Sequence, residues 1–299
     1  MIHILDLHYR APRTIASFVI DTPEGPVVIE TGPESCFAAL EKGLAGFGYS
    51  REDVRHVFVT HIHLDHAGAA WRFAQHGATI YVHPKGAPHL ADPSKLWASA
   101  TRIYGDQMRT LWGRMEPVGG SQIRTLADGQ VITFGNTKVK ALEAPGHAPH
   151  HLAFQVEDAL FGGDAAGVRI GGGPAVPPCP PPDIHVEGWR ETLARIRSLG
   201  LDTLYLTHFG AYTDVESHLD TLEETLHRWS QWIKNQLRSG KAQEQITPLF
   251  EHKVAAELLQ AGLSQAEVSE YEIADPAWMS VQGLSRYWQK FHPEEILAT

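Results

Sequence analysis

The hydrophobic pattern of residues 1–212 alternates between strand-like and helix-like segments. Residues 14–20 (TIASFVI) and 26–30 (PVVIE) are rich in β-branched side chains, and the turn residues of DTPEG lie between them, which predicts a hairpin. Residues 34–48 (ESCFAALEKGLAGFG) have helical spacing, with Pro33 just before them and glycines at their end. This alternation is typical of an α/β protein.

The rest of this part of the chain continues the alternation. Further strands are expected at residues 54–60, 78–83, 122–126, 130–134, 137–143, 151–157, 159–164 and 201–210. Helices are expected at residues 66–77 and 186–200. Residues 84–117 differ, because they are mostly helix-compatible and rich in Trp, Tyr and Met. We expect them to form an insertion of two helical pieces on the sheet scaffold.

The pattern changes at about residue 213, after which no segment has the spacing of a strand. Residues 214–240 form one long helical pattern, and residues 251–264 and 276–292 predict further helices. The sequence therefore predicts a catalytic domain at 1–212 and a helical C-terminal region at 213–299.

Charge and composition narrow the classes of partner. The chain has 25 basic and 35 acidic residues and a net charge of −10, which argues against broad binding to nucleic acid or to anionic membranes. No apolar run is long enough to span a bilayer, and the N-terminus does not resemble a signal peptide. Two cysteines, Cys36 and Cys179, are too few for a disulfide framework. We expect a cytoplasmic protein with a small-molecule substrate, and the sequence leaves a homodimer open.

The densest group of chemically active side chains lies in residues 57–70, VFVTHIHLDHAGAA. It places His61, His63, Asp65 and His66 between an expected strand and an expected helix. Imidazole and carboxylate groups together suit Zn²⁺, Fe and Mn²⁺. Four residues of one short loop cannot all surround a single ion well, so further ligands are expected from other loops.

Three later segments supply such ligands. The segment EAPGHAPHH contains His147, LFGGDAAG contains Asp164, and LYLTHFG contains His208. Each ligand follows an expected strand and lies near small residues, which is a common position for functional groups in α/β proteins. The sequence therefore predicts a metal site built from four separate loops.

The order of these motifs, HxHxDH, then PGH, then GGD, then a strand that ends in THFG, resembles the metallo-β-lactamase superfamily over residues 27–210. The resemblance implies an αββα four-layer sandwich and two groups of ligands around two metal ions. The first ion is held by His61, His63 and His147, the second by Asp65, His66 and His208, and Asp164 bridges them.

The resemblance also implies the chemistry. Two divalent cations, with Zn²⁺ favoured and Fe or Mn as alternatives, share a hydroxide that attacks a carbonyl or phosphoryl centre. Asp65 is the candidate catalytic residue, because it binds the second ion and can orient the nucleophile. The chain departs from the family at Glu30-Thr31-Gly32, where Asp-x-Gly is usual. We expect Glu30 to support a metal-bound histidine from behind.

Candidates for substrate binding lie in the insertion. They are His89, Arg102, Arg109 and Trp112. The spacing of the aromatic residues is also typical of a helix packing face. We expect the insertion and the proline-rich loop at residues 174–182 to determine which substrate binds.

The motifs most resemble the glyoxalase II-like group, which predicts a hydrolase of a thioester, ester or lactone. Three alternatives remain open: a mononuclear iron persulfide dioxygenase, a phosphodiesterase, and a non-catalytic or metal-sensing scaffold on the same fold. The acidic chain argues against the nucleases of the superfamily.

Overall fold

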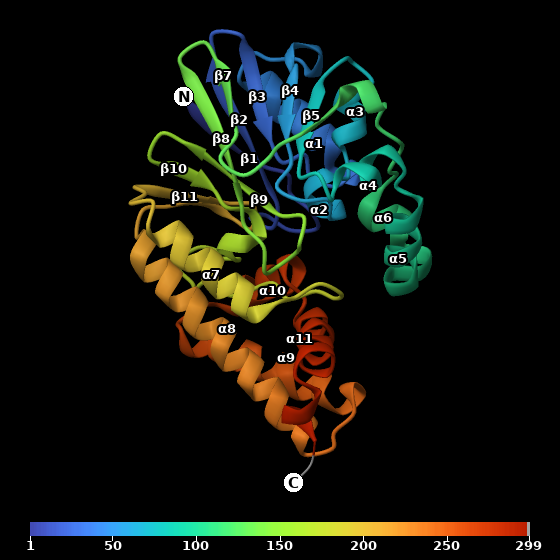
Figure 1. Cartoon of the computed structure of the whole chain (residues 1–299), viewed down its shortest axis with the longest axis vertical. Coiled ribbons are helices and arrows are strands. Elements are labelled where there is room, and N and C mark those ends of the chain that lie inside the picture. Colours follow the sequence, from blue (N-terminus) through green and yellow to red (C-terminus); the bar gives the residue numbers. More distant parts are fainter. Residues whose placement is uncertain (298–299) are drawn as a thin grey trace.

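Two six-stranded β-sheets face each other between layers of helices in the computed structural model, which describes residues 1–297 (Figure 1). This arrangement confirms the predicted αββα sandwich, and helices follow it at the C-terminal end.

The first sheet has the strand order β1-β2-β3-β4-β5-β6. Its strands are β1 (Ile2–Asp6), β2 (Ala16–Thr22), β3 (Gly25–Ile29), β4 (His56–Phe58), β5 (Thr79–Val82) and β6 (Ile123–Thr125). β1, β2 and β3 pair antiparallel, as the predicted hairpin requires, whereas β3 to β6 pair parallel. The parallel strands all end at the same edge of the sheet, which brings the loops that follow them together.

The second sheet has the strand order β12-β11-β10-β9-β8-β7. Its strands are β7 (Val131–Phe134), β8 (Thr137–Glu143), β9 (Leu152–Val156), β10 (Ala159–Phe161), β11 (Thr203–Leu206) and β12 (Gly210–Tyr212). All neighbours pair antiparallel except β10 and β11, which are parallel.

The helices occupy the outer layers, the insertion and the C-terminal region. They are α1 (Phe37–Gly46), α2 (Leu64–Ala67), α3 (Ala70–Ala74), α4 (Ala87–Ala91), α5 (Ser94–Tyr104), α6 (Met108–Trp112), α7 (Val186–Arg197), α8 (Val215–Arg238), α9 (Gln243–Gln260), α10 (Gln265–Ala274) and α11 (Ala277–Phe291).

The core between the sheets follows from the two-residue period of the strands. Phe18 of β2 points inward and meets Phe161 of β10 edge to face, with 5.2 Å between ring centroids. Phe58 of β4 meets Phe154 of β9 in the same way and at the same distance. The next residue along β2, Val19, lies on the opposite face and packs in the cluster under α1 and α3. Both faces of this sheet are therefore buried, which fixes its register.

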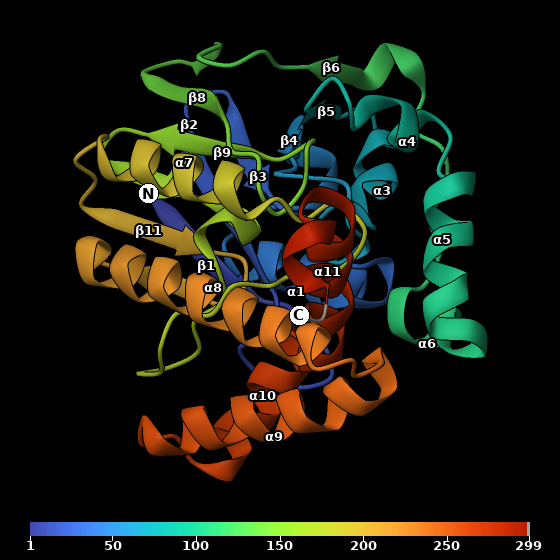
Figure 2. The same ribbon diagram turned by 60° about the horizontal axis from the view of Figure 1, so that its bottom comes forward.

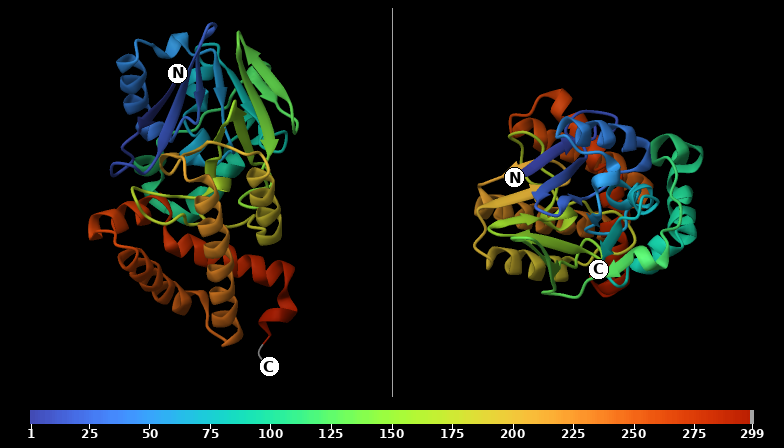
Figure 3. Two further views of the ribbon diagram at one scale, coloured as in Figure 1. Left: turned by 90° about the vertical axis from the view of Figure 1, so that its left-hand side faces the viewer. Right: turned by 90° about the horizontal axis from the view of Figure 1, so that it is seen from above.

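The C-terminal helices share a hydrophobic cluster with the second sheet. The buried positions of α8 recur every three or four residues, for example Leu219, Leu222 and Leu226, and they belong to the same cluster as Leu204 and Leu206 of β11. Figure 3 shows these helices at one end of the sandwich. The division of the chain into domains at residues 212 and 213 stays a prediction. Within residues 1–297, no helix combines the length and hydropathy needed to cross a bilayer.

Several elements were not predicted or have other bounds than predicted. The helix expected at residues 251–264 is α9, which begins at Gln243 and ends at Gln260. β1 was not expected, and neither was α10. The insertion contains three α-helices, α4, α5 and α6, and not two, because Pro93 and Gly105 interrupt the helical pattern. The helix expected at residues 66–77 begins at Leu64 and is split into α2 and α3.

Candidate metal centre

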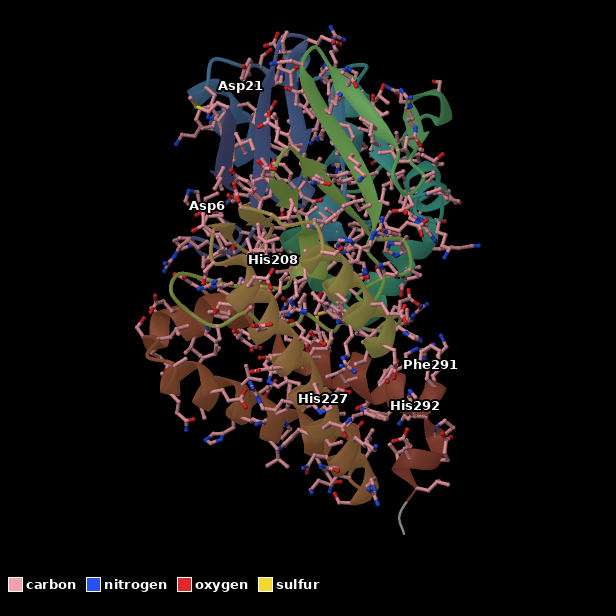
Figure 4. The ribbon with its side chains drawn as sticks, turned by 60° about the vertical axis from the view of Figure 1, so that its left-hand side comes forward. Asp6, Asp21, His208, His227, Phe291 and His292 are labelled. Atoms are coloured by element: carbon pink, nitrogen blue, oxygen red, sulfur yellow. The ribbon has the colours of Figure 1, made fainter. Side chains whose placement is uncertain are left out.

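The seven predicted ligands lie at the ends of strands from both sheets. His61 and His63 follow β4, His147 follows β8, and His208 follows β11. Asp164 lies in a short 3-10 turn directly after β10. Asp65, which was expected in the loop before the helix, lies within α2 together with His66. The sandwich thus brings four separate segments to one edge, where His208 lies between the sheets and the C-terminal helices (Figure 4).

The first group of donor atoms comes from three histidines and one carboxylate. His61, His63, His147 and Asp164 each offer one atom, and these atoms all lie within 4.8 Å of one another. His63 Nδ1 lies 2.9 Å from His61 Nε2 and 3.1 Å from His147 Nε2. Ligand atoms of a tetrahedral zinc site lie about 3.3 Å apart, given Zn–N bonds of about 2.0–2.1 Å. The separations in this group therefore match a common metal ion.

The second group contains Asp65, His66 and His208, whose donor atoms meet the same 4.8 Å limit. Asp65 Oδ2 lies 3.5 Å from His208 Nε2 and 3.7 Å from His66 Nε2. Asp164 connects the two groups. Its Oδ2 lies 3.3 Å from His147 Nε2, while its Oδ1 lies 3.2 Å from His66 Nε2. One carboxylate therefore presents one oxygen to each group.

Two atoms at the junction of the groups lack hydrogen-bond partners. His66 Nε2 and Asp164 Oδ1 are both buried, and within residues 1–297 neither has a hydrogen bond of acceptable geometry. A buried polar atom without a partner is unfavourable unless an ion or water satisfies it. These residues therefore fit metal ions, both in the chemistry of the donors and in what the protein leaves unsatisfied.

Contacts behind the ligands aim the histidine Nε2 atoms at the centre. His208 Nδ1 donates to the carbonyl oxygen of Thr14 at 2.5 Å, and His147 Nδ1 donates to that of Pro178 at 2.9 Å. Such bonds fix the tautomer and the ring orientation of a metal-binding histidine. The proline-rich loop thus takes part in holding the centre.

Glu30 lies where the sequence places it, behind a predicted ligand. Its side chain is fully buried, its Oε2 lies 2.5 Å from His66 Nδ1, and its Oε1 accepts a hydrogen bond from the backbone N–H of Thr60 at 2.6 Å. The longer glutamate side chain therefore still reaches the histidine, although the backbone at Glu30 has a left-handed φ of 65°.

Replacing Glu30 with alanine is expected to weaken metal binding about 10–100-fold, because His66 Nδ1 and the Thr60 N–H lose their common acceptor. Competition with a chromophoric chelator measures this affinity. Glu157→Ala is the matched control, because Glu157 also has a left-handed φ, of 52°, but is exposed and far from the centre in the fold. An affinity unchanged in Glu30→Ala would show that Glu30 only fills space.

The charges of the centre support metal binding. Burial and, to a smaller extent, the neighbouring His147 lower the pKa of His63 to about 3, so this ring is neutral. Burial alone raises the pKa of Asp65, but His66 and His208 bring it down to about 2, so the carboxylate is ionised. Neutral imidazole and ionised carboxylate are the forms that bind metal.

His66 is different. Burial lowers its pKa, but the carboxylates of Asp164, Asp65 and Glu30 outweigh burial and raise the pKa well above the usual range. A proton and a metal ion therefore compete for His66 Nε2.

A cavity of about 180 Å³ adjoins the centre. His63, Asp65, Asp164 and His208 form part of its wall. The cavity is far larger than the space of one water molecule. It can therefore receive an organic group next to the metal ligands.

Of the four predicted substrate residues, only Trp112 lines this cavity. Arg102 and Arg109 are exposed, and His89 is half-buried away from the wall. Sequence reasoning missed Tyr9, Arg10, Asp275 and Met279, which do line the cavity. No local motif marks these four residues, because they meet only through the folding of the N-terminal loop and of the α10–α11 turn around the centre.

Comparison with known proteins identifies the family. The model of the metallo-β-lactamase superfamily matches residues 10–208. A metallo-β-lactamase fold-containing protein of Sulfurisphaera tokodaii is 27% identical over 61% of this chain and 71% of its own length. A hydroxyacylglutathione hydrolase of a Shewanella species is 29% identical over 50% of this chain and 43% of its own. An atrochrysone carboxyl ACP thioesterase of Aspergillus novofumigatus is 26% identical over 68% of this chain and 51% of its own.

The match spans about half the length of the last two relatives. Among solved structures, a metallo-β-lactamase family protein from Thermus thermophilus matches with a TM-score of 0.69 and 20% identity. That match covers 97% of this chain and 93% of the other, so the shared fold includes the C-terminal helices.

Proposed function

This chain belongs to the metallo-β-lactamase superfamily, and from that premise we propose that it is a hydrolase that uses two metal ions to cleave a thioester, ester or lactone. Zn²⁺ is the proposed metal, because histidine nitrogens and carboxylate oxygens suit it, although Fe and Mn share these ligands.

The position of Asp164 is the main support for two ions. Its two oxygens face different groups of donor atoms, at 3.3 Å from His147 Nε2 and 3.2 Å from His66 Nε2. A carboxylate between two cations reduces their repulsion and keeps them close. Two bound cations would lower the pKa of a water molecule between them and polarise the carbonyl oxygen of a substrate.

The residues around the centre have separate roles in this proposal. Asp65 is more open than two of its neighbours in the centre, with 22% of its side chain exposed, against 6% for Asp164 and none for His66. Its ionised carboxylate can accept a hydrogen bond from the attacking water and orient it toward the substrate. The buried ligands exclude bulk water from the other side of the centre.

Thioesters are the first choice of substrate. Two relatives are named as a hydroxyacylglutathione hydrolase and an ACP thioesterase, and a thioester carbonyl is a good electrophile for an activated water. The cavity beside Asp65 and His208 has room for the acyl part of such a substrate.

A substrate panel with metal analysis tests this proposal. The protein as purified is assayed with acetyl thioesters, esters, lactones and phosphodiesters. Thiol release from the thioesters is measured with a chromogenic reagent. We expect thioester turnover that a chelator abolishes and that Zn²⁺ restores. One iron per chain together with oxygen uptake on glutathione persulfide would instead establish the dioxygenase, and turnover of phosphodiesters alone would establish that alternative.

A further inference from the structure

The cavity beside the metal centre has walls from four distant parts of the chain. The loop after β1 contributes Tyr9, and α5 contributes Leu96 and Ile103. The adjoining ends of α10 and α11 contribute Ile273 and Met279. The proline-rich loop closes another side. Figure 2 shows α5 and α6 at one side of the molecule and α11 nearer its centre. The insertion and the C-terminal region therefore enclose the space in front of the metal ligands.

The two enclosing parts touch each other across this space. Tyr104 Oη at the end of α5 donates to Met279 Sδ in α11 at 3.5 Å. The ring of Tyr104 also meets that of Trp112 edge to face at 5.2 Å, and Trp112 stacks on Tyr9 at 5.4 Å. A continuous aromatic wall thus runs from the N-terminal loop to the C-terminal helices.

Few charged groups face the cavity. Among the described residues that line it, the charged side chains outside the metal centre are Arg10 and Asp275. Arg10 is exposed and therefore lies at the mouth. Asp275 is buried, and no side-chain hydrogen bond holds it within residues 1–297. Burial raises the pKa of this carboxyl group well above the usual range.

We propose that this cavity is the acyl site of the enzyme and that it binds the uncharged, apolar acyl chain of the substrate between α5 and the α10–α11 turn. The scissile carbonyl then lies at the metal centre, and the thiol or alcohol part leaves through the mouth beside Arg10. This inference rests on the proposed hydrolase function and assigns its substrate class.

A chain-length series provides the first test. Acetyl, butyryl, hexanoyl, octanoyl and decanoyl thioesters of one small thiol are compared by kcat/KM. Each buried methylene is expected to raise kcat/KM about fourfold until the cavity is full. Succinyl and glutaryl thioesters are expected to be poorer than butyryl, because the wall offers no cation inside the mouth. A flat profile, or a preference for the dicarboxylic acyl groups, would overturn the proposal.

Two substitutions on α5 locate the site. Ala100 lines the cavity, whereas Ala98 of the same helix is exposed and does not line it. In Ala100→Trp, the ratio of decanoyl to acetyl kcat/KM is expected to fall about tenfold or more, since the indole occupies the space of several methylenes. Ala98→Trp is expected to keep the ratio of the unchanged protein. The same fall in both variants, or in neither, would contradict the location.

A binding measurement separates this inference from the proposed function. Methyl ketones with short and long alkyl chains cannot be hydrolysed, and calorimetry measures their affinity for the metal-loaded protein. Tighter binding of the longer ketones, weakened in Ala100→Trp, supports the acyl site even if no thioester is cleaved, in which case only the hydrolase proposal fails. Thioester turnover without any dependence on chain length in either assay would overturn the acyl site alone.

Discussion

Asp164→Ala is expected to remove bound metal and hydrolytic activity together. The carboxylate presents Oδ2 to His147 and Oδ1 to His66, so its loss takes a ligand from both groups at once. Changes to residues behind metal ligands typically cost 10–100-fold, and the loss of a shared ligand is expected to exceed about 100-fold in kcat/KM. Metal content per chain and thioester turnover are measured on the same preparation.

The control for this variant is Asp158→Ala. Asp158 is an exposed aspartate in the turn before β10, and its side chain makes no contact with the centre. Its metal content and turnover should equal those of the unchanged protein. Full activity of Asp164→Ala with normal metal content would rule out the bridging role.

His208→Ala is expected to affect the two ions unequally. The first group, His61, His63, His147 and Asp164, keeps all its donors, whereas the second group keeps only Asp65 and His66 besides the bridge. We expect about one ion per chain to remain and kcat/KM to fall at least about 100-fold, because a two-metal site activates the water and the substrate jointly. Metal analysis after dialysis checks the stoichiometry.

His227→Ala is the matched control. His227 lies on the exposed side of α8, well away from His208 (Figure 4). It should retain the metal content and turnover of the unchanged protein. Loss of both ions in His208→Ala, with the fold intact by circular dichroism, would mean that the two metal ions do not bind independently of each other.

The candidate metal centre could be predicted from the sequence because five of its seven predicted ligands, all except Asp65 and His66, follow a strand. A residue directly after a strand lies at the edge of its sheet wherever the strand pairs, so His61, His147 and His208 could be placed near one another before their distances were known. The long helix α8 was equally clear, since Leu219, Leu222 and Leu226 repeat with its period and are all buried.

The errors have physical causes. β1 lies at the edge of its sheet, and most of its positions are only partly buried, so its sequence lacks clear alternation. α10 buries only Val268 and Tyr271, which is too weak a pattern for a helix of ten residues.

The cavity could be predicted only in part: the insertion and the proline-rich loop line it as expected, but the N-terminal loop and the C-terminal helices were not expected there. Its wall depends on the contact of Tyr104 with Met279, which are 175 positions apart in the chain. Neither residue lies in a motif that points to the other. Periodicity reports which face of a helix is buried, but not what lies across a cavity from it.

The two-metal centre is tested most directly by anomalous X-ray scattering from crystals of the protein as purified, recorded above the absorption edge of the metal found by analysis. Two peaks about 3.5–4 Å apart are expected. One should lie among His61, His63 and His147, the other among Asp65, His66 and His208, with the Asp164 carboxylate between them. A single peak at full occupancy, or peaks away from these side chains, would contradict the two-metal centre.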